Sequence, residues 1–163
     1  MQKTIISIVL IGGAIFLVGK IMTTPPEASR PGAAPRIEIS PSEYDLGQVS
    51  MAQGKITRVY QVKNVGEGPL KLSAIWTSCA CTTAALKIDQ KTSPLFGMPG
   101  HGVNPAFWSE TLAPGQAGEL EVVFDPAFHG PTGLGEIVRV VYLESNDKAR
   151  PRSEAKFFGE VIP

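Results

Sequence analysis

The stretch Lys55-Ile56-Thr57-Arg58-Val59-Tyr60-Gln61-Val62-Lys63-Asn64-Val65 shows most clearly which fold this 163-residue chain adopts. In a β-strand successive side chains point to opposite faces, so Ile56, Tyr60 and Val62 share one side. Arg58 is the exception on that side. The opposite side is mostly polar: Lys55, Thr57, Gln61 and Lys63. The pattern predicts a β-strand with one buried face.

The same alternation recurs in both directions from this strand. Further short strands are expected at 36–40, 44–47, 70–72, 120–124, 137–143 and 153–161. The alternation shifts by one residue at Ala74-Ile75, which predicts a bulge or bend before the cysteines. Residues 137–143 are apolar on both sides apart from Arg139, which predicts a central strand.

These strands predict an all-β domain. Seventeen glycines and fourteen prolines supply turns, and no helical period appears after residue 22. Short strands at regular spacing are typical of an antiparallel β-sandwich. Its predicted core includes the following residues: Tyr60, Val62, Leu72, Leu120, Phe124 and Val141.

The N-terminal region differs from the rest of the chain. Residues 4–19 carry no charge, and Ile21 and Met22 extend the apolar run past Lys20. Residues 1–22 are therefore interpreted as one transmembrane signal anchor or a cleaved signal peptide. Residues 23–35 form a linker rich in proline and small residues, and 36–163 form the sandwich. We expect membrane anchoring through residues 4–22, with the domain in the periplasm or the extracellular space.

Residues 87–108 interrupt the strand rhythm as an insert. Their prolines and glycines exclude a helix or a central strand. Their apolar side chains indicate an ordered loop that packs against the sandwich or a partner. The aromatic residues of the insert are candidates for partner binding: Phe96, Phe107 and Trp108.

The two cysteines, Cys79 and Cys81, stand one residue apart in a strand-like context. A regular strand would hold them too far apart for a disulfide, but a bend after Ile75 would allow one. Three interpretations stay open: a disulfide, packing of two small apolar side chains, and a soft-metal site. Copper(I) or zinc would suit two thiolates, with Met98 and His101, or alternatively His129, as further ligands.

Several landmarks occur together in one order: Asp45-Leu46-Gly47, Asn64-Val65-Gly66, Pro69-Leu70-Lys71-Leu72, Ser78-Cys79-Ala80-Cys81-Thr82, Leu112-Ala113-Pro114-Gly115, Val123-Phe124-Asp125-Pro126, Ser145-Asn146-Asp147 and Gly159-Glu160-Val161. Over residues 37–161 the order resembles the bacterial exported domain-of-unknown-function family numbered fifteen seventy-three. The resemblance implies an immunoglobulin-like sandwich of the ASH and major-sperm-protein group. It implies no established activity.

Composition and motifs argue against several functions. Fifteen basic and fifteen acidic residues leave no net charge that would attract nucleic acid. No nucleophile elbow, phosphate loop or dinucleotide fingerprint occurs, so we expect no enzyme and no cofactor. The preferred hypothesis is a non-catalytic, membrane-anchored module that binds another envelope protein or takes part in envelope assembly. The alternative is a copper- or zinc-binding protein that uses the Cys79–Cys81 pair.

Overall fold

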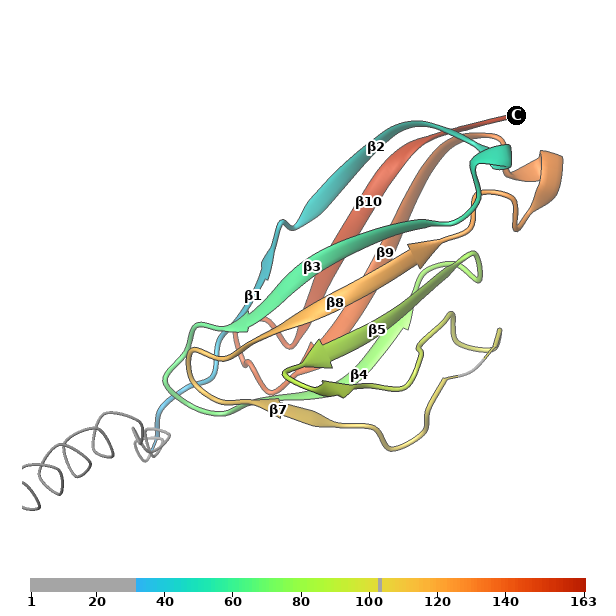
Figure 1. Ribbon diagram of the computed structural model, residues 1–163. Helices are drawn as coiled ribbons and strands as arrows, with labels where there is room; N and C mark the ends of the chain where they lie inside the picture. Colours follow the sequence, from blue (N-terminus) through green and yellow to red (C-terminus); the bar gives the residue numbers. More distant parts are fainter. Residues whose placement is uncertain (1–31, 103) are drawn as a thin grey trace, which may run out of the picture.

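The computed structural model describes residues 32–102 and 104–163. Within these residues no helix is long and apolar enough to span a membrane. The signal helix expected at 1–22, and most of the linker, lie outside the described residues. The elements are, in order (Figure 1): β1 (Ile37–Ser40), β2 (Glu43–Ser50), the 3-10 turn η1 (Met51–Gln53), β3 (Ile56–Asn64), β4 (Leu70–Thr77), β5 (Thr82–Ile88), β6 (Lys91–Thr92), β7 (Glu110–Leu112), β8 (Ala117–Phe124), the 3-10 turn η2 (Gly130–Gly133), β9 (Gly135–Ser145) and β10 (Arg152–Ile162).

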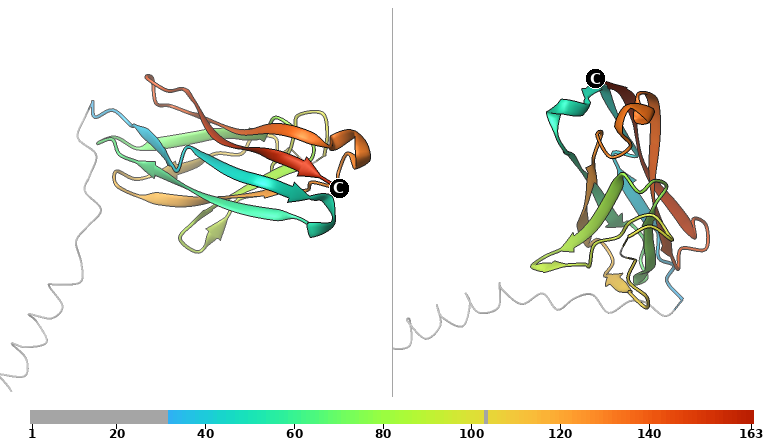
Figure 2. Two further views of the ribbon diagram at one scale, coloured as in Figure 1. Left: turned by 90° about the horizontal axis from the view of Figure 1, so that it is seen from above. Right: turned by 90° about the vertical axis from the view of Figure 1, so that its right-hand side faces the viewer.

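The strands form two five-stranded sheets, which confirms the all-β prediction. Sheet A has the order β1-β3-β8-β5-β6, and sheet B has the order β2-β10-β9-β4-β7. Seen in two further directions, the strands run along one long axis, with residues 32–36 entering at one end and the C-terminus at the other (Figure 2). One pairing corrects the antiparallel expectation, because β2 runs parallel to β10.

The core lies between the sheets. The six predicted core residues are all buried, with Phe124 the most exposed at 3%. The rings of Phe124 in β8 and Phe157 in β10 pack 5.2 Å apart and join the sheets. The Tyr60 hydroxyl donates a 2.7 Å hydrogen bond to the carbonyl of Lys156. Burying each such side chain contributes about 1.5–3 kcal/mol of stability.

β9 has the central position that its sequence predicts. It lies between β10 and β4, so it is a central strand, and the shift predicted near Ala74 is a bulge between Leu72 and Ala74. The two sides of β9 differ in burial. Ile137 and Val141 are buried, whereas Val138 is 59% exposed. The central position is as predicted, and its outer side is partly exposed because sheet B packs against sheet A with its inner face alone.

The end of the linker belongs to the folded domain. The Ala34 carbonyl accepts hydrogen bonds from the backbone N–H groups of Glu67 and Gly68, at 3.1 and 3.2 Å. A Cβ at Gly68 would stand 2.1 Å from the Ala33 carbonyl oxygen. Only glycine permits this close approach. The chain therefore joins the sandwich before the predicted boundary at residue 36, at what we call the near end.

The insert begins later than predicted, since Lys87 and Ile88 belong to β5 and β6 follows. Ala84 of β5 and Phe96 exchange backbone hydrogen bonds of 2.9 and 2.8 Å, so the insert runs along the edge of β5. Phe96 is 2% exposed and lies in the core. The Trp108 ring packs edge-on against it, 4.9 Å away.

This packing changes the list of partner-binding candidates. Phe96 is not accessible to a partner, because its ring is buried between the sheets. Trp108 is half-buried against the same cluster. Phe107 is fully exposed and keeps its predicted role as a candidate.

Candidate functional site

The two cysteines lie in a tight turn at the far end of the sandwich, opposite the entry of residues 32–36 (Figure 1). β4 ends at Thr77 and β5 begins at Thr82. The N–H of Thr82 donates to the Cys79 carbonyl over 3.1 Å and closes the turn. The Thr77 hydroxyl donates to the same carbonyl over 2.9 Å. The strand-like context expected from the sequence is therefore wrong, and the bend is the correct alternative.

The loop after β8 brings a histidine to this turn. β5 and β8 are neighbours, with Thr82 opposite Phe124. The N–H of Asp125 then donates to the Cys81 carbonyl over 2.9 Å, which holds the start of the loop against the turn. Four residues later, Nε2 of His129 lies 3.2 Å from Sγ of Cys79.

Arg139 completes the group from sheet B. It occupies an inward position of β9, between the buried residues Ile137 and Val141. Its Nε–H donates to Sγ of Cys81 over 3.2 Å. Arg139, the one charged residue on the inward side of β9 between Ile137 and Leu143, therefore contacts a thiol, which gives its inward position a chemical reason.

The pKa values of the two thiols are shifted in opposite directions. Burial opposes ionisation of Cys79, but hydrogen bonds from Cys81 and His129, with the charge of Arg139, outweigh it and lower the Cys79 pKa to about 7. Burial, together with the neighbouring Cys79, raises the pKa of Cys81. Cys79 is therefore the thiol that ionises first.

Of the two histidines that the sequence offered as alternatives, the structure brings His129 to the cysteines and leaves His101 apart from them. Both thiols are free in the structure, and the disulfide stays a prediction. Within the described residues, Cys79, Cys81 and His129 form a group whose ligand atoms lie within 4.8 Å of one another. His101 is exposed on the insert and lies outside this group. A metal role for Met98 stays a prediction.

A second candidate is the outer side of sheet B. The aromatic rings of Trp76 and Tyr142 stack 5.3 Å apart, with the Arg152 guanidinium 5.1 Å from the Trp76 ring. Val138 and Phe158 are directly paired further along the sheet. We call this surface the β9 face; its apolar side chains are Trp76, Val138, Val140, Tyr142 and Phe158.

The β9 face is hollowed beside Val138. The hollow has a volume of about 470 Å³ and an apolar floor of Val138 and Phe158. Gly159 crosses close to β2, where a Cβ would stand 2.7 Å from the Gly47 carbonyl oxygen. Polar side chains surround the floor: Asp45, Gln48, Glu136 and Glu160. The hollow is therefore apolar below and acidic at its rim.

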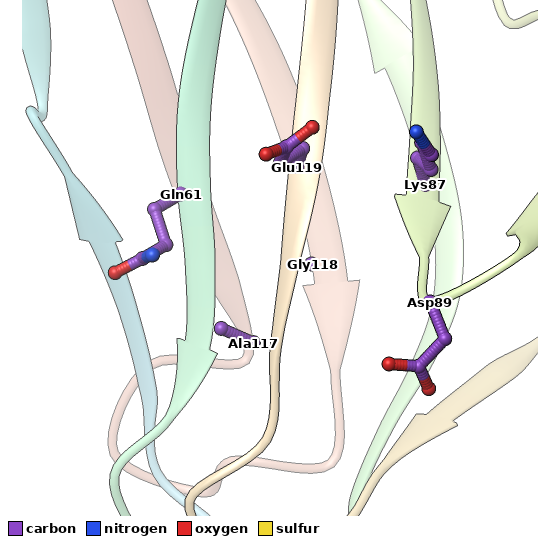
Figure 3. Close-up of a pocket in the computed structure, with 6 residues that line it drawn as sticks. All are labelled: Gln61, Lys87, Asp89, Ala117, Gly118 and Glu119. Carbon is purple, nitrogen blue, oxygen red and sulfur yellow. The ribbon is translucent and has the colours of Figure 1, made fainter.

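Sheet A carries a different hollow, of about 270 Å³. It lies over Ala117 and Gly118, which have little or no side chain to fill the surface. Figure 3 shows the side chains of Gln61, Glu119 and Lys87 spread over three strands, without converging on one point. This arrangement offers no cluster of groups for binding or catalysis.

Comparison with known proteins confirms the family resemblance over part of the chain. Residues 37–94 match the family model described as "Protein of unknown function (DUF1573)". This segment includes β1 to β6 and the cysteine turn. Among curated proteins, none matches.

Solved structures show the fold alone. A protein of unknown function from Porphyromonas gingivalis W83 aligns with a TM-score of 0.57 and 22% identity, over 77% of this chain and 46% of that one. This chain thus spans less than half of that protein's length. The ASH/PapD-like domain 7 of human CEP192 aligns with a TM-score of 0.47 and 14% identity, over 86% and 90% of the two chains.

Proposed function

We propose that this protein is a non-catalytic, membrane-anchored binding module on the extracytoplasmic side, which docks an envelope protein on the β9 face. The observation that carries the proposal is the exposure of Val138 on a central strand. The outer side of a two-layer antiparallel sheet is normally polar, and an apolar row there indicates a contact surface.

The side chains that line the hollow indicate what kind of partner would bind there. Val138 and Phe158 offer an apolar floor, and Asp45, Glu136 and Glu160 place carboxylates at its rim. A protein segment that presents an apolar side chain flanked by lysine or arginine complements both features. The stacked Trp76 and Tyr142 extend the surface along the sheet, and aromatic residues are frequent anchors in interfaces.

The membrane anchor rests on the sequence. The uncharged run of residues 4–19, extended by Ile21 and Met22, is long enough for a short spanning helix. Protease treatment of intact and permeabilised cells tests the topology. We expect the domain to be cleaved from outside the cytoplasmic membrane, with the N-terminal segment retained in the membrane. A full-length protein in the cytosolic fraction would refute this part.

Site-specific photo-cross-linking tests the docking surface. A photoreactive phenylalanine analogue replaces Val138 in the full chain, and a matched variant carries it at Val59, an exposed valine of sheet A. We expect one discrete cross-linked protein from position 138 and none from position 59. The charge reversals Glu136→Lys and Glu160→Lys should suppress that product. Equal cross-linking at both positions would contradict a specific face.

A further inference from the structure

Three metal-ligating side chains meet at the far end of the sandwich, away from the β9 face. Cys79 and Cys81 come from the β4–β5 turn, and His129 comes from the β8–β9 loop. All three ligand atoms lie within 4.8 Å of one another. The backbone hydrogen bond from Thr82 to Cys79 closes the turn, and the one from Asp125 to Cys81 holds the β8–β9 loop against it. The donors are therefore held together before any ligand arrives.

This spacing fits one metal ion. Bonds of about 2.3 Å to sulfur and about 2.1 Å to imidazole nitrogen place donors around a three-coordinate ion roughly 3.7–4 Å apart. The 3.2 Å contact between Cys79 and His129 needs to open by only a fraction of an ångström. His129 is exposed and lies in a loop, so this adjustment is small.

We propose that Cys79, Cys81 and His129 bind one copper(I) ion. Two thiolates are soft ligands of the kind that copper(I) prefers, and imidazole also suits copper. The binding of the ion releases the proton of each thiol to solvent, because thiolate is the form that ligates. The oxidation state of the copper and of both sulfurs stays unchanged.

The charge of Arg139 favours copper(I) over zinc(II). Two thiolates and one copper(I) ion carry a net charge of −1, which the guanidinium on Cys81 balances. With zinc(II) the thiolates already cancel the metal charge, and the guanidinium would remain uncompensated. Zinc also prefers four ligands in structural sites, whereas the group found in the described residues has three.

The site is closed on one side and open on the other. Cys81 is buried, Cys79 is half-buried and His129 is exposed. An ion held there faces solvent through His129, so a second soft-ligand protein can reach it. The inference is independent of docking on the β9 face, and it extends the protein's role to copper handling.

Copper(I) titration of the full chain in detergent, with thiols reduced and a colorimetric copper(I) chelator as competitor, tests the proposal. We expect one copper(I) per chain, with X-ray absorption showing two sulfur donors and one nitrogen donor. Cys79→Ser should abolish stoichiometric binding. His129→Ala should weaken binding by at least about tenfold, because it removes a ligand. Arg139→Gln should weaken binding by about 10–100-fold, because groups that contact a ligand also set the metal affinity.

The matched control is His101→Ala, which removes the chain's other histidine and should bind copper(I) as the unsubstituted chain does. Circular dichroism melts check that each variant folds. Because Cys79 is only half-buried, its serine variant keeps the test valid even where Cys81→Ser fails to fold. Retained affinity in Cys79→Ser, tighter binding of zinc(II) than copper(I), or no copper on a chain with two reduced thiols would each overturn the proposal.

Discussion

The two ends of the sandwich use their polar side chains in opposite ways. At the near end, Asn64 is fully buried and donates to the carbonyls of Gly68 and Leu112 over 2.8 and 3.0 Å. Asp147, also buried, accepts a 3.0 Å hydrogen bond from the N–H of Ile37. At the far end, the thiols contact side chains instead: His129 on Cys79 and Arg139 on Cys81.

The polar side chains of the near end therefore stabilise the fold, whereas those of the far end form a reactive site. A buried amide or carboxylate that satisfies backbone groups ties loops together, and its removal leaves those groups unpaired. The thiols of the far end, by contrast, close no loop through backbone carbonyls, and their sulfur atoms are nucleophiles and metal ligands when ionised. We therefore expect substitutions at the near end to cost stability, and substitutions at the far end to change reactivity and binding.

The largest stability effect is expected at Asn64. Asn64→Ala removes its hydrogen bonds to Gly66, Gly68 and Leu112 and should lower the free energy of unfolding by roughly 3 kcal/mol, because the backbone groups stay buried without partners. Chemical denaturation measures the loss. The control Gln61→Ala, on the outer face of the same strand, should change stability by less than about 0.5 kcal/mol. Equal losses at the two positions would show that the near end is not held by Asn64.

Asp147 should give a smaller and pH-dependent effect. Burial opposes its ionisation, but hydrogen bonds from the N–H groups of Ile37, Ala149 and Arg150 prevail and lower its pKa. Its contribution is therefore fully present above the usual aspartate pKa of 3.8 and declines as pH falls through the lower folded-state value. Asp147→Asn should cost about 1–2 kcal/mol at pH 7.

Unfolding of both proteins between pH 2 and pH 7 checks this prediction. The stability of the unsubstituted protein should fall more steeply with acid than that of Asp147→Asn, so the two curves converge at low pH. Parallel curves would mean that the carboxylate is not specifically stabilised in the folded state.

The two thiols should differ in alkylation rate by about tenfold or more at pH 7, since the reactive species is the thiolate. Cys79, whose pKa is about 7, is half ionised there, whereas the pKa of Cys81 is raised. Mass spectrometry after brief iodoacetamide treatment of the reduced protein locates the label. The Cys79 rate should rise with pH through about 7 and then level. Equal labelling of both thiols would remove the distinction between them.

The smallest stability effect is expected at His129. Its side chain is exposed and lies in a loop, so His129→Ala should change the free energy of unfolding by less than about 0.5 kcal/mol. Thermal melts of the copper-free protein measure this. A loss comparable to that of Asn64→Ala would make His129 a structural residue and erase the contrast between the ends.

Much of the fold follows from local pattern. The alternation of Ile56, Tyr60 and Val62 is enough to place one side of a strand in the core, because the strand register that buries these apolar side chains is the stable one. The one-residue shift near Ala74 predicts the bulge for the same reason. The order of the short motifs, from Asp45-Leu46-Gly47 onward, also carries the family resemblance, which is confirmed for residues 37–94.

Only the tertiary structure decides which distant groups meet. Nothing local distinguishes His129 from His101, and the pairing of β5 with β8 brings the former to the cysteines. The exposure of Val138 depends on what covers sheet B, a property of layers and not of strands. The alternation of apolar and polar residues predicts which side chains are buried. Strand pairing between distant segments determines which side chains become neighbours, and the chemistry of Cys79 depends on those neighbours.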